Sequence, residues 1–397
     1  MDKTLGVSSM PPAPGALNRS GPERDDPAVD LEALLADASS PAQVRRAMAT
    51  PAGWDPGLWR ALAARGVLGL HLAPEWGGSG RPFSAVAAVA EELGAALACI
   101  PHLATVVLAA TALVRSGDEQ AASEHLPAIA AGSVVATLAV TEDSGRWDER
   151  DVRSVARPVG GGRDGHVLDG RKSYVPGGCS ADLVLVVARE EPGRRGPDAV
   201  AGTGLFAVAG DAPGLTRVPL VALDQTRPLA RLELAGVPAR RVGGVGDGWR
   251  IVEPVLDRAA VALAAEAVGG AQRCLDMAVA HARTRVQFGR PIGSFQGVQH
   301  KLADVLVTVE AARSVAAAAA SAADGDGDDL ALLASTAKAY CSETFVRAAS
   351  ESVQVHGALG CTWDHDAHLY LKRARSSALL LGEPAWHRER VATLLGL

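Results

Sequence analysis

Apolar and polar positions divide the 397-residue chain into three zones. Residues 29–133 show helical spacing, and runs such as "SAVAAVAEELGAALACI" are apolar on nearly every side, so we expect buried helices there. Residues 134–245 hold short β-type runs about ten residues apart, separated by turns rich in Gly, Asp and Pro. This spacing predicts an antiparallel barrel or sandwich.

Residues 246–397 return to long helical patterns joined by short Gly or Pro breaks. One run places Leu302, Val305, Leu306 and Val309 at positions i, i+3, i+4 and i+7, which predicts a core-facing stripe. Several long helices with short links predict an antiparallel four-helix bundle. The order of a helical zone, a β zone and a helical bundle predicts an α+β fold with a central β-barrel domain.

Composition narrows the possible functions. The net charge of −6 argues against nucleic acid or an acidic membrane surface as partner, and no run of about 18 uncharged apolar residues predicts a membrane span. The five cysteines are odd in number and lack a CxxC pair, which favours reduced thiols in the cytoplasm and no thiolate metal site. Residues 1–28 have the composition of a disordered leader and lack the features of a signal peptide.

The stretch "RTRVQFGRPIGSFQGVQHKLAD", residues 283–304, interrupts two alanine-rich helical patterns with basic, amide and aromatic side chains. Guanidinium groups, a turn with free N–H groups and the start of a helix suit a diphosphate. Phenylalanine rings and glutamine amides suit the faces and edges of a planar ring system. From composition alone, a basic corner between two helices explains the stretch equally well.

This stretch resembles the flavin segment of the acyl-CoA dehydrogenase family, whose pattern runs R-x-Q-F-G-x-P-I-x-x-F-Q-x-x-Q-x-x-L-A-D. In that family the segment binds the FAD of a neighbouring subunit. The resemblance implies that Arg285 binds the diphosphate, with Gln287, Phe288 and Gln296 beside it.

Other segments resemble the same family in order and spacing. "GVLGLHLAPEWGGSG" is similar to its N-terminal helix and loop. "LAVTE" makes Thr141 a hydrogen-bond partner of the isoalloxazine ring, and "DGRKSYVPGG" places Tyr174 as the aromatic residue against it. "QVHGALG" resembles the segment that meets the adenosine half, which implies contacts from Gln354, Gly357 and Ala358. The three zones correspond to the family's helical, barrel and bundle domains.

The catalytic base of the family is missing from its two usual positions. The family removes a proton next to a thioester carbonyl and passes a hydride from the next carbon to the flavin, which requires a base. Aligning Gly382 and Arg388 with the Y-E-G-T region puts Leu381 where the glutamate stands in many members. The position used by a second subgroup is near Ala259. Neither side chain can accept a proton.

Three residues are candidate replacements for the base. Glu266 lies on an apolar helix, where burial would raise its pKa. Glu383 opens a helix and His387 precedes an arginine, so a helix-start charge and a surface or interface residue are the simpler readings. Nearby, Pro176 replaces the threonine that often bonds the flavin, and Trp147 replaces a serine near the substrate.

Three further motifs have simpler explanations than a ligand site. "GGVGDG" (243–248) lacks the GxGxxG spacing and is interpreted as the barrel-to-bundle linker. "DGDGDD" (Asp324–Asp329) lacks the closing glutamate of a calcium loop and is interpreted as a connector. His365, Asp366 and His368 could ligate a metal, but they fit a helix start and the family uses no metal.

The resemblance implies an FAD-dependent dehydrogenase or desaturase that oxidises an acyl thioester, carried by CoA or an acyl-carrier protein, at its α and β carbons. It also implies an electron acceptor such as an electron-transfer flavoprotein, and a homodimer or tetramer. Two alternatives remain open. One is a non-catalytic partner in a mixed tetramer with a sister subunit, and the other is a flavin monooxygenase on the same fold. A purely structural helical protein would leave the motifs unexplained.

Overall fold

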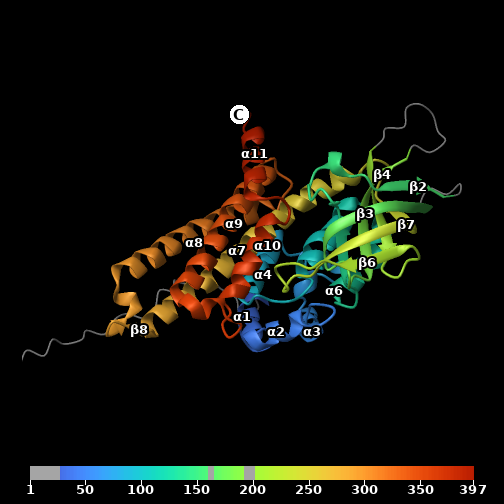
Figure 1. Ribbon diagram of the computed structural model, residues 1–397. Helices are drawn as coiled ribbons and strands as arrows, with labels where there is room; N and C mark the ends of the chain where they lie inside the picture. The colour runs from blue at the N-terminus through green and yellow to red at the C-terminus, as the bar shows by residue number, and fades with distance from the viewer. Residues whose placement is uncertain (1–26, 160–164, 192–201) are drawn as a thin grey trace, which may run out of the picture.

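The structure, a computed structural model, describes residues 27–159, 165–191 and 202–397. Residues 1–26 of the predicted leader and most of the predicted "GGGRDG" turn lie outside the described residues. Helix α1 begins at Pro27, so the helical zone starts within the segment predicted as leader. Figure 1 shows a helical bundle and a barrel as two lobes joined by the N-terminal helices and α7.

The N-terminal zone is helical, as predicted. Its elements are α1 (Pro27–Ala38), α2 (Pro41–Met48), α3 (Pro56–Ala64), η1 (Val67–Gly69), η2 (Pro74–Trp76), α4 (Phe83–Ala95), η3 (Leu103–Ala110), α5 (Thr111–Ser116) and α6 (Glu119–Ala130). The side chain of Asp55 accepts hydrogen bonds from the first N–H groups of α3, and that of Asp118 does the same for α6. The apolar run at η3 forms a π-helical stretch that is buried throughout.

The short β runs predicted in residues 134–245 form strands: β1 (Ala136–Ala139), β2 (Val155–Pro158), β3 (Gly165–Pro176), β4 (Leu183–Glu190), β5 (Thr203–Ala209), β6 (Leu215–Pro219) and β7 (Leu229–Val242). Strands β4, β2, β3, β7 and β5 pair in that order, and β5 pairs back to β4, which closes the barrel. The prediction of a wholly antiparallel sheet was wrong, because β4 pairs with β1 and with β2 in parallel. Strand β3, which is antiparallel to β2, lies between β2 and β4 in the chain, so β4 returns in the direction of β2.

Strand β4 is buried on both faces. Leu183, Leu185 and Val187 pack with the helices, whereas Val184 and Val186 face the interior of the barrel. Successive side chains of a strand point to opposite faces, so one strand contributes to both cores. This explains why β4 is an almost continuous apolar run rather than an alternating one.

The C-terminal zone contains α7 (Gly248–Thr284), the hairpin β8 (Val286–Gln287) and β9 (Arg290–Pro291), η5 (Ile292–Ser294), α8 (Gln296–Ala322), α9 (Asp329–His356), η6 (Gly357–Cys361), α10 (Ala367–Leu379) and α11 (Pro384–Leu394). Helix α9 packs against α7, α8, α10 and α11. Residues 243–247 connect β7 to α7, as the linker interpretation predicts. Asp326 of the predicted connector forms ion pairs with Arg115 and Arg258.

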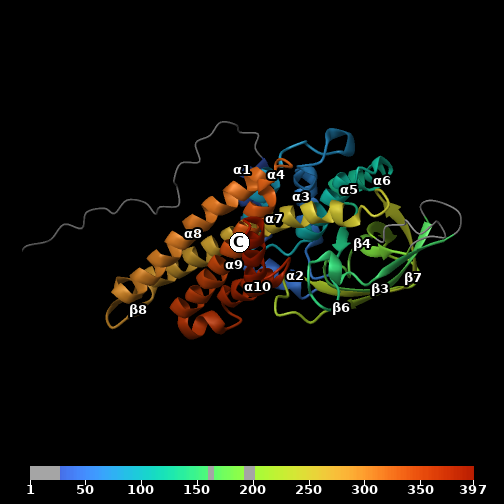
Figure 2. The ribbon, with the colours of Figure 1, turned by 90° about the horizontal axis from the view of Figure 1, so that it is seen from above.

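The stripe predicted on α8 is only partly buried. Val305 and Val309 are buried and Leu302 is half-buried, but Leu306 is 40% exposed and its neighbour Val307 is 69% exposed. Helix α8 lies on the outside of the bundle, so only one narrow line of side chains meets α7 and α9 (Figure 2). Leu306 was therefore wrongly predicted as core, since among the described residues its helix face is only partly covered and it stays 40% exposed.

Helix α8 is also long and apolar enough, by length and composition, to cross a membrane, although the sequence analysis predicted no span. Such a test is also passed by core helices of proteins that have no membrane span. Arg313 in this helix forms an ion pair with Glu91 of α4. This contact and the packing on α7 and α9 are those of a bundle helix.

Helices α4 and α7 cross at glycines. A Cβ atom on Gly94 would lie 2.1 Å from the carbonyl oxygen of Glu266, and one on Gly269 would lie 1.9 Å from that of Glu91. A side chain at either position would force the two backbones apart. The crossing therefore fixes the segment of α7 that carries both Ala259 and Glu266.

Candidate active site

The predicted diphosphate segment forms the tip between α7 and α8. Its hairpin turns through Phe288 and Gly289, which have φ angles of +52° and +79°. Two consecutive positive φ angles are typical of the type I′ turn of a two-residue hairpin, and Gly289 makes that turn possible. The Phe288 side chain is 92% exposed, and its ring lies 6.1 Å from that of Phe295.

The polar groups of this tip are open to a ligand. Arg285, Gln287 and Gln296 are exposed, and the Arg285 guanidinium has no hydrogen bond or ion pair with the part of the chain that the structure describes. Helix α8 starts at Gln296, so its partial positive charge lies in the same segment. This set of donors fits a diphosphate.

The predicted adenosine segment lies at the same end of the bundle. Gln354, Gly357 and Ala358 are exposed where α9 ends and η6 begins, and Gly357 has a φ of +62°. The ring of His356 lies 4.4 Å from that of His281 in the last turn of α7. The structure therefore brings the diphosphate and adenosine segments together, as their predicted roles require.

The predicted flavin-ring residues lie on the barrel instead. Thr141 is buried, and its hydroxyl donates to the carbonyl oxygen of Ser173 at 2.7 Å. Tyr174 on β3 is 42% exposed, has a φ of +58° and packs near Gly145. The Thr141 oxygen can still accept a hydrogen bond, and Tyr174 offers an exposed ring face.

A polar network that the sequence analysis missed fixes these two residues. Lys172 is fully buried, and its ammonium donates to Glu142 at 2.8 Å and to the carbonyl oxygen of Val140 at 3.0 Å. Ser173 donates to Asp143 at 2.6 Å. The fixed contacts tie β3 to the end of β1 around Thr141. A lysine within an otherwise alternating strand was the available signal.

One chain does not bring the two groups of predicted residues together. In both views the hairpin β8–β9 lies at one end of the molecule and the barrel at the other (Figures 1 and 2). Helix α7 runs between them for 37 residues, which corresponds to about 55 Å at 1.5 Å per residue. A dinucleotide cannot reach across that distance.

Leu381 lies beside a cleft of about 610 Å³ between α7, α11 and the loop after β1. The walls of the cleft include Trp147, Trp249 and Trp386. Leu381 itself is 3% exposed and has a φ of +61°. The rim carries five acidic side chains, Asp148, Glu149, Glu253, Asp257 and Glu389, against the two basic side chains Arg150 and Arg390.

Two of the candidate bases are poorly suited to that role. Glu383 is exposed at the N-cap of α11, consistent with a helix-start charge. His387 is buried rather than on the surface, and its Nε2–H donates to the carbonyl oxygen of Leu381 at 3.0 Å. Burial, followed by the charge of Lys338, lowers the pKa of His387 to about 3. A ring with such a pKa is a weak base at neutral pH.

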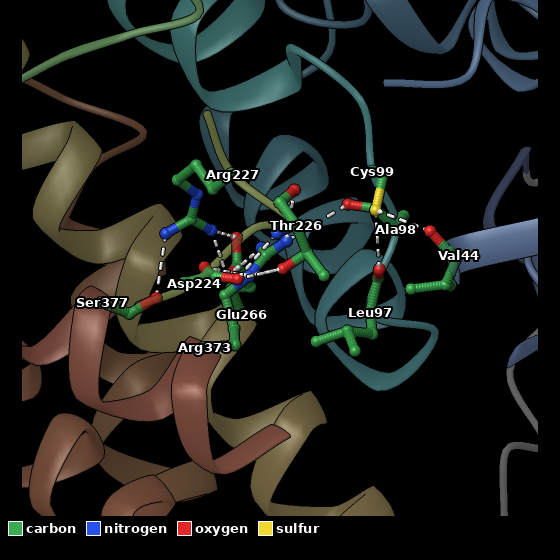
Figure 3. A network of polar contacts seen from close by, with 10 residues as sticks. All are labelled: Val44, Leu97, Ala98, Cys99, Asp224, Thr226, Arg227, Glu266, Arg373 and Ser377. Carbon is green, nitrogen blue, oxygen red and sulfur yellow. Dashed lines mark hydrogen bonds and ion pairs between the residues drawn. The ribbon is translucent and has the colours of Figure 1, made fainter. Parts of the chain in front are cut away.

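Glu266 belongs to a buried ion network, which Figure 3 shows between α7, α10 and the loop before β7. The Arg227 guanidinium binds both carboxylate oxygens, and Arg373 Nη1 donates to Oε1 at 3.0 Å. Arg373 also pairs with Asp224 at 3.0 Å. Burial alone raises the pKa of Glu266, but the two guanidinium groups outweigh it and lower the pKa. The expectation of a raised pKa was therefore wrong, because the sequence does not show that Arg227 and Arg373 lie beside Glu266 in the fold.

Comparison with known proteins identifies the family. The acyl-CoA dehydrogenase N-terminal domain matches residues 33–133, and the C-terminal domain matches residues 246–395. Acyl-CoA dehydrogenase IpdE2 of Mycobacterium tuberculosis is 36% identical over 359 residues, which cover 89% of this chain and 91% of that protein. The chain belongs to the acyl-CoA dehydrogenase family. The predicted fold class is confirmed, with the parallel strand pairs as the one difference.

Solved structures of this family agree with the fold. A variant of the Tcur3481–Tcur3483 steroid ACAD is 30% identical with a TM-score of 0.82, covering 93% of this chain and 96% of that chain. The ChsE4–ChsE5 complex from Mycobacterium tuberculosis is 29% identical with a TM-score of 0.83, covering 95% and 98%. Acyl-CoA dehydrogenases are oxidoreductases that act on CH–CH groups and are generally flavin-dependent.

Proposed function

We propose that this acyl-CoA dehydrogenase family member is an FAD-holding subunit that oxidises the Cα–Cβ bond of an acyl thioester together with a sister subunit. The thioester is carried by CoA or an acyl-carrier protein, and an electron-transfer flavoprotein or similar protein accepts the electrons. The sister subunit supplies the base. This proposal joins two readings of the sequence, the dehydrogenase and the partner subunit of a mixed tetramer.

One observation carries the proposal: the two usual positions of the family base hold apolar side chains, and the buried candidate Glu266 is already neutralised by arginines. Leu381 and Ala259 occupy the two positions of the family base, and both are apolar and buried. The carboxylate of Glu266 is held by Arg227 and Arg373. The acidic rim of the cleft beside Leu381 also disfavours the approach of CoA, which carries several negative charges.

The separation of the two predicted site groups supports a shared assembly. Arg285 and Gln354 lie at the bundle end, whereas Thr141 and Tyr174 lie on the barrel, and α7 spans about 55 Å between them. A site built from both groups needs two chains. Two similar solved structures carry paired subunit names, Tcur3481–Tcur3483 and ChsE4–ChsE5, which fits a mixed assembly.

In the proposed assembly, FAD when bound supplies the hydride acceptor. Arg285 neutralises the diphosphate and the start of α8 adds partial positive charge. The exposed ring of Tyr174 would help to hold the flavin, and the hydroxyl oxygen of Thr141 would accept a hydrogen bond from it. Lys172 and Glu142 keep the barrel strands at a fixed distance so that these contacts are preorganised.

The test compares the chain purified alone with the chain co-purified with its co-expressed sister subunit. Each sample is titrated anaerobically with straight-chain and steroid-bearing acyl-CoA thioesters, the latter because one similar structure is a steroid ACAD. We expect flavin absorbance to bleach only in the mixed sample. Full bleaching by the chain alone would show that it carries its own base. A colourless protein that cannot be reconstituted with FAD would refute the proposal.

A further inference from the structure

Three imidazole rings, here called the stack, pack against one another with their planes tilted by 35° and 44°, at the bundle end that carries the predicted dinucleotide residues. His281 comes from the last turn of α7, His356 from the last turn of α9, and His365 from the segment before α10. The ring centroids of His281 and His356 are 4.4 Å apart, and those of His356 and His365 are 4.1 Å apart. The stack joins the two chain segments that contain Arg285 and Gly357.

Hydrogen bonds fix the tautomer and orientation of two of the rings. Nδ1 of His356 lies 2.7 Å from the carbonyl oxygen of Ser352, so Nδ1 carries the hydrogen and Nε2 keeps a lone pair. Nδ1 of His365 accepts from the N–H of Ala367 at 3.1 Å. The carbonyl oxygen of His281 accepts from the N–H of Arg285 at 2.8 Å, which links the stack to the diphosphate segment.

The surrounding charges are mainly positive. The charge of Arg285 lowers the pKa of His281. The charge of Asp366 raises the pKa of His365, and that of Arg45 of α2 lowers it. Asp366 is paired with Arg45, and Glu351 of α9 is paired with Lys301 of α8, so neither carboxylate is free to balance the stack. Burial, the neighbouring imidazoles and Arg285 lower the pKa of His281, and burial with His356 lowers that of His365 despite Asp366.

We propose that His281 and His365, packed on either side of His356, form a proton-linked part of the dinucleotide site, in which binding of the diphosphate draws one proton onto one of these two rings. This inference rests on the proposed function, because it needs the diphosphate to bind beside Arg285. The stack then acts as a positioning element, since a charged imidazole between the α7 and α9 ends attracts the diphosphate and holds both segments against it.

Electrostatics sets the number of protons taken up on binding and the direction in which FAD affinity changes with pH. Like charges on rings about 4 Å apart repel, so a proton on one ring disfavours a proton on its neighbour, and we expect the bound diphosphate to add no more than one proton. Without ligand the pKa values of His281 and His365 lie below 6.5, so protonation below pH 6.5 favours the unfolded chain. A bound diphosphate is negatively charged, so it favours the protonated form of a neighbouring imidazole and raises its pKa. Affinity for FAD therefore rises as the pH falls.

The experiment measures FAD binding to the deflavinated protein, in its sister-subunit complex if the chain alone does not retain FAD. Flavin titrations run from pH 5.5 to 8.0, and calorimetry at pH 6.5 in two buffers of different ionisation enthalpy counts the protons taken up. We expect about a tenfold gain in affinity between pH 7.5 and 5.5 and uptake approaching one proton. Constant affinity with no proton uptake overturns the inference while leaving FAD binding, and thus the proposed function, intact.

Matched variants assign the effect to the stack. His281→Gln and His365→Gln keep polar side chains that cannot titrate, and we expect each to reduce both the pH dependence and the proton uptake. His125→Gln on α6 is the control, because His125 also has a pKa lowered mainly by burial but lies on another element. Arg285→Ala should weaken binding at every pH and leave the proton uptake in place. Uptake that persists in both stack variants overturns the inference.

Discussion

The ammonium of Lys172 lies 2.8 Å from a carboxylate oxygen of Glu142 in a site where the lysine is fully buried. Glu142 also accepts from the N–H groups of Arg153 and Ser154, at 2.8 Å each. Burial alone raises the pKa of Glu142, but Lys172 and these hydrogen bonds together lower it. This pair holds the ends of β1 and β3 beside the predicted flavin-ring residues.

Replacing Lys172 by Met should destabilise the fold by up to about 3–5 kcal/mol, because Glu142, whose side chain is only 12% exposed, loses its charged partner. Urea unfolding followed by circular dichroism measures the change. Arg157→Met is the control, since the Arg157–Asp169 pair is largely exposed and should contribute at most about 1 kcal/mol. Equal effects of the two variants would show that the buried pair has no special role.

Glu266→Gln should also cost about 3–5 kcal/mol, because Arg227 loses its carboxylate inside the protein. The pKa of Glu266 is lowered in the folded chain, so its stabilisation is present above its ordinary value of 4.5 and is lost as the pH falls through the lowered pKa. Unfolding curves from pH 3 to 7 should therefore show a weaker acid dependence in the variant. A stable but inactive variant would instead support Glu266 as the base.

We expect the burial of Lys338 to make the stability of the fold depend on pH in the alkaline range. It is buried with three neutral acceptors at 3.2 Å, the Ser342 hydroxyl and the carbonyl oxygens of Ala378 and Gly382. Burial, with a smaller effect from Arg227, lowers its pKa from 10.5 to about 7. Between these values the unfolded chain holds a proton that the folded chain lacks, so stability rises with pH by at most about 1.4 kcal/mol per unit.

Lys338→Met should remove this rise, measured by urea unfolding at pH 7.0, 8.5 and 10. Lys301→Met is the matched control, because Lys301 is about half exposed and paired with Glu351. A Lys338 variant that keeps the full alkaline rise would contradict the lowered pKa.

Arg285→Ala should reduce affinity for FAD about tenfold or more, because a hydrogen bond to a charged group contributes about 1.5–3 kcal/mol. Flavin content after gel filtration and FAD titration of the deflavinated protein measure the loss. Arg283→Ala is the control, since both arginines are exposed near the end of α7 but the family pattern assigns only Arg285 to the diphosphate. Unchanged flavin content in the Arg285 variant would refute that assignment.

Leu381→Glu should place a carboxylate at the usual position of the family base and allow an acyl-CoA to bleach the flavin without a sister subunit. Leu381→Gln, which has nearly the same shape but cannot accept the proton, is the control. Anaerobic spectra of both variants with the thioester panel measure the gain. A folded, FAD-containing Glu variant that no thioester bleaches would show that Leu381 does not face the reacting carbons.

Local patterns determined the elements and the candidate cofactor residues. The period of two in the β zone and the period of 3.6 elsewhere follow from the geometry of strand and helix, so the strands of the β zone and the long helices were predicted. The segment from Arg285 to Gln296 was recognisable because its residues match the family pattern within one short stretch of chain. Its loop conformation, with Phe288 at positive φ, required the structure.

Tertiary structure decided everything that depends on distant partners. Glu266 changed from a possible base to an ion-pair residue because Arg227 and Arg373 reach it from other elements, and no local pattern encodes that meeting. Leu306 is 40% exposed because α7 and α9 pack against another side of α8, and the sequence of α8 does not show which side they cover. The sequence by itself thus determined which residues suit a flavin dinucleotide, whereas the length of α7 decided that one chain cannot bring them together.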